Sequence, residues 1–585
     1  MNALDSPPQD PQASLARWGA GMIRAAFDEY LARFRGITGR ARRRFEARDW
    51  RGHQRDARER LDVVTEVLWA TMLRLRTQFG DGVRDKRLWM KMRSLYADMV
   101  RELPTVELAE TFFNSVTRRI FTTVGVDPDI EFVAPACPPP PSNGPIHRTF
   151  IRNGSTEALL AEILRSYAFE SPYRDFEGDV KTGAALIDRH FARCGDGRPP
   201  EVIELAIPRF YRGKGAYLVG RALHNGETIP FILALLHVED GVYLDAVLPT
   251  YKDARVLFSF ARSYFHVNIE RPYDLVDFLQ SILPIRRKSE LYISIGYNKH
   301  GKTELYRDIL AHLSTTDERF ELAQGDRGLV MIVFTLPSLE LVFKVIRSRF
   351  LPPKSTSRTE VKNKYKLVFR QDRAGRLADA QEFEFLAFDA GRFAPDLLME
   401  LLSEASDTVR VEGNTVIIQH LYVEKRVRPL NLFLREAGAA DAREALNDYG
   451  QAIRDLAATN TFPGDLLLKN FGVTLNGRVI FYDYDELTLV TECNFRDLPT
   501  ASTDEEEMSG EPWFYVGPND IFPEEFIRFL GLTPEQEQAF LSAHRDLLTS
   551  SFWREMQARV QAGEIVDVFP YPPDRRLSGG EATTH

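Results

Sequence analysis

The chain has 585 residues, a length that predicts roughly two to four domains rather than one. Its composition, 44% hydrophobic and 27% charged, is that of a soluble globular protein. The formal net charge of −9 disfavours a general nucleic-acid binder, for which a basic excess is usual. The three cysteines, Cys137, Cys194 and Cys493, lie far apart without CxxC spacing, so they indicate neither a disulfide framework nor a zinc site.

The N-terminal segment shows no basic region followed by an apolar run. No stretch of the chain approaches the ~18 uninterrupted apolar residues of a membrane helix. We therefore expect a cytoplasmic protein that has no membrane partner and no nucleic-acid partner.

The first part of the chain, to about residue 130, is predicted to be helical because apolar residues recur at three- to four-residue steps. The residues that mark this apolar face are Leu15, Trp18, Ile23, Phe27, Tyr30, Leu31 and Phe34. Arginines and acidic residues alternate between Arg40 and Arg60. We interpret that run as a solvated helix face rather than a nucleic-acid patch.

A proline-rich segment, Cys137 to Pro145, interrupts this pattern and is predicted to be an extended linker. Strand-like runs follow at Glu201 to Pro208, Gly215 to Leu223 and Gly241 to Leu248. Asp240 and the glycine after it give the Asp-Gly signal of a hairpin turn. This part of the chain is therefore expected to be α-rich with a β insert.

From about Glu321 the pattern changes to a strand pair, a helical region, a second strand pair and then helices. The predicted division is a first domain of residues 1–310, a second domain of residues 311–577, and a disordered tail, SGGEATTH, at residues 578–585.

Residues Gly296 to Thr303 read GYNKHGKT and fit the P-loop pattern G-x-x-x-x-G-K-[ST]. In that interpretation Lys302 contacts the β- and γ-phosphates and Thr303 binds Mg²⁺. Bulky side chains inside the loop and the lack of repeated βα units weigh against it. A strand-to-helix turn with surface lysines is the alternative, and a P-loop ATPase is kept as the second candidate function.

Three elements farther along the chain agree on a nucleotide site of protein-kinase type. The first is the pair Gly325 and Gly328, which precedes an apolar strand starting at Val330. Glycines there let the backbone approach phosphates closely. By itself the pair is a weak signal, because Ala323 stands where the protein-kinase pattern has its first glycine.

The second element is Lys344, which lies in the apolar run LVFKVI fourteen residues after Val330. A charge within an apolar strand is costly unless it is paired. In protein kinases this lysine holds the α- and β-phosphates and pairs with a glutamate on a helix. We expect Glu382 or Glu384, in a run predicted to be helical, to supply that partner.

The third element is the string FPGDLLLKNFGVTLNGRVIFYDYDE, in which Asp465 and Asn470 are five residues apart and Asp483 follows thirteen residues later. The kinase catalytic loop has its Asp and Asn at the same spacing, and a metal-binding Asp follows one hairpin later. Asp465 is thus the predicted proton acceptor for an attacking hydroxyl. Asn470 and Asp483 are the predicted ligands of Mg²⁺, a cation that prefers such oxygen donors.

Two departures from the kinase pattern bear on the reaction. Pro463 and Gly464 replace His-Arg before Asp465, and the turn after the hairpin reads Asp-Tyr-Asp in place of Asp-Phe-Gly. The extra carboxylate, Asp485, is suited to orient a water molecule and hints at hydrolysis alongside transfer. Capping of the local backbone is the alternative role for Asp485.

These motifs resemble the bacterial isocitrate dehydrogenase kinase/phosphatase family over nearly the whole chain. The strings that carry the resemblance, in the same order, are GYNKHGKTELYRDIL, VMIVFTLPS, VFKVI, FPGDLLLKNFGV, RVIFYDYDE and NFRDLP. The resemblance implies an α+β fold, in which a bilobal protein-kinase-like domain follows a mostly α-helical regulatory domain with a β insert.

The resemblance also implies a bifunctional enzyme. Such an enzyme phosphorylates and inactivates NADP-dependent isocitrate dehydrogenase on a serine and reverses this step, which controls flow between the citric acid cycle and the glyoxylate bypass. One cleft would serve both reactions with Mg²⁺ and ATP, or ADP in the phosphatase direction. AMP, bound between the two domains, would favour the phosphatase. GYNKHGKT would lie outside the cleft.

The resemblance and the motifs together give the predicted site. The ATP-binding residues are Ala323, Gln324, Gly325, Asp326, Arg327, Gly328, Leu329, Lys344 and Glu382; the catalytic residues are Asp465, Asp379, Asp485 and Lys469; the metal ligands are Asn470 and Asp483. Asp379 enters only because it matches a position that the family treats as an active-site aspartate.

Two further interpretations stay open. The acidic stretch Thr503 to Trp513 follows the metal-binding turn, where kinases bind substrate, so it is a candidate for recognising the dehydrogenase; a solvated loop is the alternative. The imperfect glycine loop and the missing His-Arg also allow a pseudokinase scaffold that binds a partner without catalysis.

Overall fold

The computed structural model describes residues 11–134, 138–141, 144–193, 197–259, 264–350, 356–371, 373–499 and 514–577. The predicted acidic recognition stretch, residues 503–513, and the predicted disordered tail, residues 578–585, lie outside the described residues, as does part of the predicted proline-rich linker.

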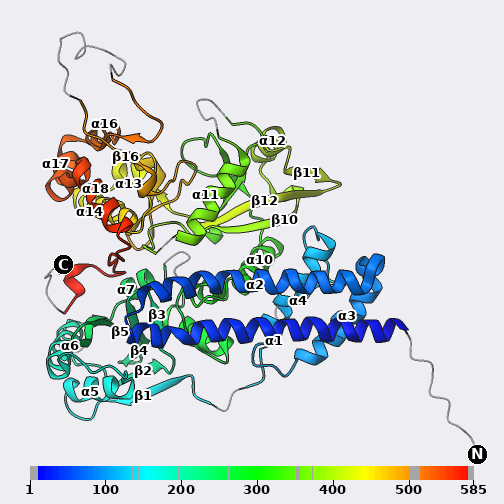
Figure 1. The fold of residues 1–585 in the computed structure, drawn as a ribbon, viewed down its shortest axis with the longest axis horizontal. Coiled ribbons are helices and arrows are strands. Elements are labelled where there is room, and N and C mark those ends of the chain that lie inside the picture. The colour runs from blue at the N-terminus through cyan, green and yellow to red at the C-terminus, as the bar shows by residue number, and fades with distance from the viewer. Residues whose placement is uncertain are drawn as a thin grey trace, which may run out of the picture.

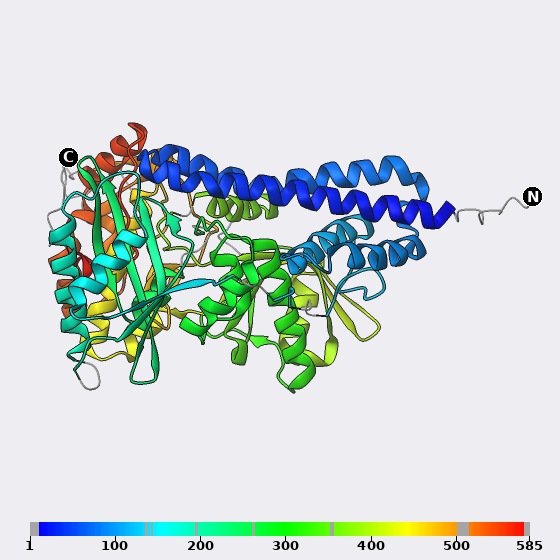
Figure 2. The ribbon, with the colours of Figure 1, turned by 90° about the horizontal axis from the view of Figure 1, so that it is seen from below.

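Helices form the first part of the chain, as the apolar spacing predicts. They are α1 (Pro11–Glu46), α2 (Trp50–Phe79), α3 (Lys86–Val100) and α4 (Val106–Phe121). The long helices α1 and α2 lie side by side and run along one edge of the molecule (Figures 1 and 2). Ile23 and Phe27 are buried as predicted, whereas Trp18 stays 41% exposed and packs edge-on against Phe79.

The charged run from Arg40 to Arg60 spans the turn between α1 and α2 and is solvated only in part. Arg43, Arg55 and Arg58 are exposed, as the predicted solvated face requires, whereas other charges of the run are buried and paired. The buried Asp56 accepts from Arg40 and Arg44, each at 2.9 Å. Arg60 is also buried and donates to the carbonyl of Phe265 at 2.8 Å. These contacts hold α1, α2 and the loop that contains Phe265 together.

The predicted β insert is an antiparallel sheet of order β1-β2-β4-β5-β6, with β3 paired to β4. Its strands are β1 (His147–Ile151), β2 (Val202–Ala206), β3 (Phe210–Arg212), β4 (Gly215–His224), β5 (Glu227–Val238) and β6 (Gly241–Leu248). The Asp-Gly hairpin turn joins β5 to β6 as predicted. Gly241 is required there, since its φ is 134° and a Cβ would lie 2.6 Å from the carbonyl oxygen of Pro172.

Helices cover both faces of this sheet. One face packs on α5 (Thr156–Ser166) and α6 (Phe176–Phe191), and the other packs on α8 (Pro272–Ile282). The short helix α7 (Tyr251–Leu257) follows β6 and lies on the side of the sheet that faces the second domain (Figure 1).

The P-loop interpretation, which was kept only as the second candidate, is not supported by the structure. The apolar run before GYNKHGKT is helix α9 (Lys288–Ser294) rather than a strand, because Leu291 and Tyr292 are buried in the helical core. Most of GYNKHGKT is the start of α10 (Asn298–Thr315), so no loop is left to surround phosphates, and the strand-to-helix turn that was the alternative is also absent. The predicted domain boundary after residue 310 falls inside α10.

The second domain begins with a sheet of order β10-β12-β9-β8-β7, with β11 paired to β12. Its elements are β7 (Glu321–Leu322), β8 (Met331–Leu336), β9 (Leu341–Ile346), α11 (Arg358–Gln371), β10 (Gln381–Asp389), α12 (Pro395–Glu404), β11 (Val409–Glu412) and β12 (Thr415–Lys425). The run that includes β10 was predicted to be helical. The core takes Phe383, Leu386 and Phe388 from β10, and this burial overrides the helix preference of its Ala and Glu residues.

A helical lobe completes the second domain. Its elements are β13 (Arg428–Pro429), α13 (Leu430–Glu436), α14 (Ala439–Ala458), β14 (Phe471–Val473), β15 (Val479–Phe481), β16 (Asn494–Phe495), β17 (Asp520–Ile521), α16 (Phe526–Phe529), α17 (Pro534–His544) and α18 (Ser550–Gln561). Its core is centred on the fully buried Tyr449 and Trp553. The predicted α+β, bilobal architecture is confirmed (Figure 1).

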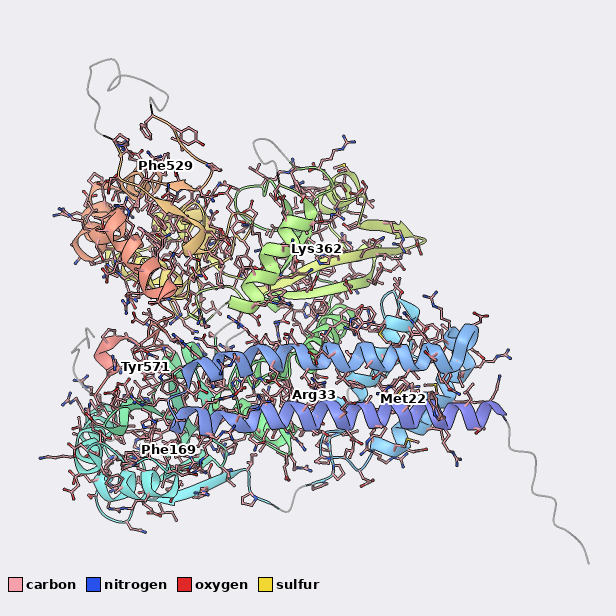
Figure 3. All side chains as sticks on the ribbon, in the orientation of Figure 1. Met22, Arg33, Phe169, Lys362, Phe529 and Tyr571 are labelled. Carbon is pink, nitrogen blue, oxygen red and sulfur yellow. The ribbon has the colours of Figure 1, made fainter. Side chains whose placement is uncertain are left out.

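The C-terminal segment returns from the helical lobe to the first domain. Asp245 of β6, which is fully buried, pairs with Arg576 at 2.9 Å and accepts from the Tyr571 hydroxyl at 2.7 Å. Tyr571 lies where the helical lobe meets the first domain (Figure 3). The two domains are therefore held together by this segment as well as by the chain connection at α10. Within the described ranges, every helix is too short or too polar to cross a membrane.

Candidate active site

The loop between α14 and β14 carries the predicted catalytic aspartate. Gly464, the residue before Asp465, has φ 91°, and a Cβ there would lie 2.6 Å from the Cβ of Glu486. Glycine is therefore required for the loop to pass the segment that follows the metal-binding turn. Asn470, which is buried, donates from its side-chain nitrogen to Asp465 Oδ1. The five-residue spacing thus brings these two side chains into contact, as predicted.

The hairpin β14–β15 brings Asn470 and Asp483 to the same end of the site. Phe471 pairs with Phe481 in the antiparallel register, and the backbone N–H of Tyr482 donates to the Asn470 carbonyl at 3.1 Å. Asp483 comes directly after this contact. The predicted short hairpin between Asn470 and Asp483 is therefore observed.

Burial, and after it the negative charge of Asp485, raise the pKa of Asp483 to about 7. The positive charge of Lys344 lowers the pKa of Asp483, and the negative charge of Asp465 raises it by less than burial and Asp485 do. Asp485, Lys344 and Asp465 therefore lie close enough to Asp483 to act on its charge. The excess of carboxylates in this group favours the binding of a cation.

Lys344 lies on β9 as predicted, but its partner differs from the prediction. Its Nζ lies 2.7 Å from Oε2 of Glu424 on β12 and donates to the Tyr482 carbonyl at 2.8 Å. The prediction of Glu382 or Glu384 as the partner is wrong, because β10 is a strand and β12 lies between β10 and β9.

Glu382 has another partner. It accepts from His420 at 2.8 Å, and this hydrogen bond lowers the pKa of Glu382 to about 2. The face of the sheet beside Lys344 is covered by α11, whose Tyr365 stacks on Tyr422 with ring centroids 3.7 Å apart. Glu424, the residue that sequence reasoning missed, could have been found as a lone acid at the end of a buried strand run, LYVE.

The backbone just before Asp379 pairs with β15, and this contact places Asp379 near the site. Leu377 bridges to Phe481 of β15 in parallel, and the Ala378 N–H donates to the Phe481 carbonyl at 2.9 Å. Gln381 holds the carboxylate by donating to Asp379 Oδ2 at 2.8 Å. Asp379 also contributes to the raised pKa of Glu424, behind the larger effect of burial.

Arg376 fixes this added strand. Its buried guanidinium donates to Asp455 at 2.7 Å and to both oxygens of Asp448 at 2.8 Å, and it also donates to the Val479 carbonyl at 3.0 Å. Asp448 and Asp455 both belong to α14. One side chain therefore joins the strand before Asp379, the metal-site hairpin and the helix behind them.

The predicted nucleotide loop, Ala323 to Leu329, connects β7 to β8. Gly325 has φ 120°, and a Cβ at Gly328 would lie 2.5 Å from the Met331 carbonyl oxygen, so both glycines are needed for this turn. The negative charge of Asp326 raises the pKa of Tyr482, although burial and Asp483 have larger effects. Arg327 instead pairs with Glu400 of α12 at 3.1 Å.

Two further lysines, Lys469 from the predicted site and Lys302 from the P-loop pattern, make other contacts. The side chain of Lys469 is exposed, and its carbonyl accepts from the Tyr482 hydroxyl. Lys302 donates to the carbonyl of Glu382 and lies 5.0 Å from the ring centre of Phe383. Lys302 is therefore not part of the carboxylate cluster that surrounds Lys344.

The oxygen donors fit a divalent cation. Because the nitrogen of the Asn470 amide donates to Asp465, its oxygen is the atom that would bind a metal together with the Asp483 carboxylate. Within the described part of the chain, no three His, Cys, Asp or Glu side chains are grouped so as to hold a metal by themselves. Mg²⁺ commonly uses one or two protein oxygens together with water and phosphate oxygens. The donor set thus suits a metal that arrives with a nucleotide.

Comparisons with known proteins cover nearly all of the chain. Residues 20–317 match the isocitrate dehydrogenase kinase/phosphatase (AceK) regulatory domain, and residues 318–573 match the isocitrate dehydrogenase kinase/phosphatase (AceK) kinase domain. An isocitrate dehydrogenase kinase/phosphatase from Anaeromyxobacter dehalogenans (strain 2CP-C) is 55% identical over 579 residues, which are 97% of this chain and 99% of the relative.

A second relative of the same name, from Xanthomonas euvesicatoria pv. vesicatoria (strain 85-10), is 44% identical and covers 98% of this chain and 99% of its own length. Among solved structures, the ROP18 kinase domain in complex with AMP-PNP and sucrose is 11% identical and covers 42% of this chain and 85% of that chain, with a TM-score of 0.21.

Replacing Arg376 by Met should lower the free energy of unfolding by about 3–5 kcal/mol, because Asp448 and Asp455 would be left without their buried counter-charge. Thermal unfolding followed by circular dichroism measures the effect. The matched control is Arg454→Met, since Arg454 pairs with the half-exposed Asp546 and its loss should cost less than about 1 kcal/mol. Equal melting temperatures for the two variants would show that Arg376 does not hold the site together.

Proposed function

The chain belongs to the isocitrate dehydrogenase kinase/phosphatase family, and we propose that it both adds phosphate to a serine of NADP-dependent isocitrate dehydrogenase and removes it. The single observation that carries the proposal is that Lys344 and Asn470 both contact the backbone of Tyr482, directly before Asp483, while the Asn470 side chain contacts Asp465. A cleft that holds a base, a phosphate-binding cation and metal ligands is complete for phosphoryl transfer.

In the kinase direction, Asp465 accepts the proton of the attacking serine hydroxyl. The serine oxygen forms a bond to the γ-phosphorus of ATP as the bond from that phosphorus to the β–γ bridging oxygen breaks, and ADP leaves. Lys344, fixed by Glu424 at 2.7 Å, holds the α- and β-phosphates. When Mg²⁺ is bound by Asn470 and Asp483, it neutralises the charge that develops on the phosphates.

In the phosphatase direction, a water oxygen forms the bond to phosphorus as the bond to the serine oxygen breaks. A carboxylate of the site takes a proton from the water, and the leaving serine oxygen takes one up. We assign to Asp485 the orientation of this water and to ADP the occupation of the nucleotide site. The closeness of Asp485 to Asp483, which raises the pKa of Asp483, supports this role. Asp379, held by Gln381, is a second carboxylate available to the same step.

We further propose that AMP shifts the balance toward the phosphatase and that the enzyme acts in the cytoplasm to control entry into the glyoxylate bypass. A site for the AMP phosphate is suggested between the domains, where α10 meets β10. Burial lowers the pKa of Lys299 well below its usual value, and the nearby cations Lys302 and Arg119 lower it further. Neighbouring cations in a desolvated place favour the binding of an anion.

The two alternative functions are less favoured. A P-loop ATPase would need a phosphate-binding loop at Gly296 to Thr303, where the chain is largely helical. A pseudokinase scaffold would not need the base, the paired lysine and the metal ligands to converge, yet these side chains lie together.

Replacing Asp483 by Asn should abolish both addition of labelled phosphate from ATP to isocitrate dehydrogenase and its removal, each by at least about a hundredfold, because both steps need the same metal ligand. The assay is run with and without AMP. Asp396→Asn, at an exposed position on α12, is the matched control and should keep both activities. Loss of only one activity in Asp483→Asn would argue against a shared cleft.

In the same assays Asp485→Asn should lose more dephosphorylation than phosphorylation, and equal losses would exclude its assigned role.

Lys344→Ala should lose ATP-dependent phosphate transfer, whereas Lys302→Ala should keep nucleotide turnover, because only Lys344 faces the carboxylate cluster. Release of labelled phosphate and its transfer to the dehydrogenase are measured for both variants, and melting curves confirm that each remains folded. The opposite pattern, turnover lost in Lys302→Ala and kept in Lys344→Ala, would restore the P-loop interpretation.

Lys299→Met should remove binding of AMP, measured by titration calorimetry, while binding of ADP with Mg²⁺ persists, because the two nucleotides use different cations. Lys366→Met, an exposed lysine on α11, serves as the control for a general loss of positive charge. AMP affinity unchanged by Lys299→Met would place the AMP phosphate elsewhere.

A further inference from the structure

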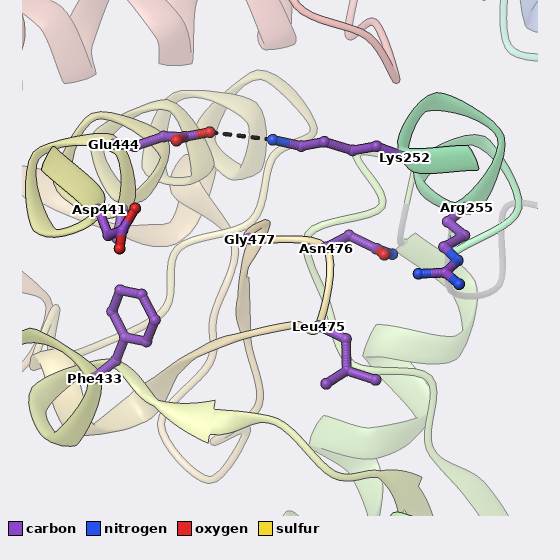
Figure 4. A pocket seen from close by; sticks show the side chains of 9 residues that line it. Lys252, Arg255, Phe433, Asp441, Glu444, Leu475, Asn476 and Gly477 are labelled. Carbon is purple, nitrogen blue, oxygen red and sulfur yellow. Dashed lines mark hydrogen bonds and ion pairs between the residues drawn. The ribbon is translucent and has the colours of Figure 1, made fainter. Parts of the chain in front are cut away.

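A cavity of about 370 Å³ lies between the two domains, at the tip of the β14–β15 hairpin. Its walls come from α7 of the first domain and from α13, α14 and the hairpin turn of the second (Figure 4). Its volume lies in the range of small-molecule sites, which is typically about 300–1,000 Å³. The cavity is separate from the Lys344 cleft and from the lysines of α10.

One wall of the cavity is cationic. Lys252 and Arg255 lie three residues apart on α7, so they share one face of that helix. Lys252 reaches across to Glu444 at 3.2 Å, and since both side chains are more than half exposed, this pair is weak and Lys252 can be redirected. The Arg255 side chain forms no hydrogen bond or ion pair with any described residue. A guanidinium with free planar donors is suited to a phosphate group.

The opposite wall combines acceptors with an apolar surface. Asp441 and Glu444 lie three residues apart on α14, Phe433 of α13 lies beside Asp441, and the amide of Asn476 comes from the hairpin turn (Figure 4). Carboxylate and amide oxygens accept hydrogen bonds from hydroxyl groups. The two acids also repel a second anionic group, so the ligand that fits has one anionic end and a neutral, hydroxyl-bearing body.

We propose that this cavity binds a small phosphorylated sugar or polyol. Its phosphate lies at Arg255 and Lys252, its hydroxyls donate to Asp441 and Glu444, and its carbon skeleton packs on Phe433. This class of ligand satisfies the cationic wall, the acidic wall and the apolar surface at once.

The position of the cavity gives such a ligand access to the active site. Residues Leu475 to Gly477 line the cavity, and the same hairpin carries Asn470 and Asp483 at its other end. A ligand that fixes the turn therefore changes the freedom of the two metal ligands. This coupling, which rests on the proposed function of those residues, is reciprocal: the ligand and Mg²⁺–ADP must change each other's affinity by the same factor.

The test is titration calorimetry of the full chain with glucose 6-phosphate, inorganic phosphate and glucose. Glucose 6-phosphate should bind, inorganic phosphate should bind at least about tenfold more weakly, and glucose should give no heat. Lack of glucose 6-phosphate binding would overturn the proposal. Equal affinities for glucose 6-phosphate and inorganic phosphate would also overturn it, because the acidic wall would then contribute nothing.

Arg255→Gln should weaken glucose 6-phosphate binding by about tenfold or more, since a charge-assisted contact is removed. Arg443→Gln changes an exposed arginine of α14 that does not line the cavity, and it should bind as the unmodified chain does. Equal loss in both variants would overturn the site. Binding of glucose 6-phosphate requires no turnover, so it is expected even if the chain has neither kinase nor phosphatase activity. Mg²⁺–ADP affinity unaffected by glucose 6-phosphate would overturn the coupling alone.

Discussion

The buried guanidinium of Arg376 is the contact on which the geometry of the second domain depends. It joins two carboxylates of α14, Asp448 and Asp455, to the carbonyl of Val479 in the hairpin. The Arg376 carbonyl and the Ala378 N–H both pair with Phe481 of β15, which places Asp379 next to the turn that carries Asp483. Since an unpaired buried charge is strongly unfavourable, the four groups must stay together in the folded state.

The first domain borders the tip of the β14–β15 hairpin. Helix α7 and the turn at Leu475 to Gly477 form opposite walls of the interdomain cavity. The C-terminal segment keeps them in place, because Arg576 and Tyr571 bind the buried Asp245 of β6. The hairpin is thus supported by Arg376 at its strands and bordered by the first domain at its tip, so changes in either domain can alter the positions of Asn470 and Asp483.

The parts of the site that were predicted correctly depend on contacts close in sequence. Asp465 and Asn470 share one loop, and a short hairpin leads to Asp483, so their spacing was enough to place them. The partner of Lys344 could not be found this way, because choosing Glu424 over Glu382 requires the strand order β10-β12-β9. Helix α9 was mistaken for a strand because a P-loop pattern fixes residue types without fixing the burial of the preceding apolar run.

The central claim is that one cleft, built on Lys344, Asn470 and Asp483, holds the nucleotide and its metal. The most direct measurement is a crystal structure of the protein grown with Mn²⁺ and a non-hydrolysable ATP analogue, with the metal located by its anomalous scattering. The account predicts an anomalous peak at the Asn470 and Asp483 side-chain oxygens and the analogue's phosphates at Lys344. A nucleotide bound at residues 296–303, or a metal away from the hairpin, would contradict it.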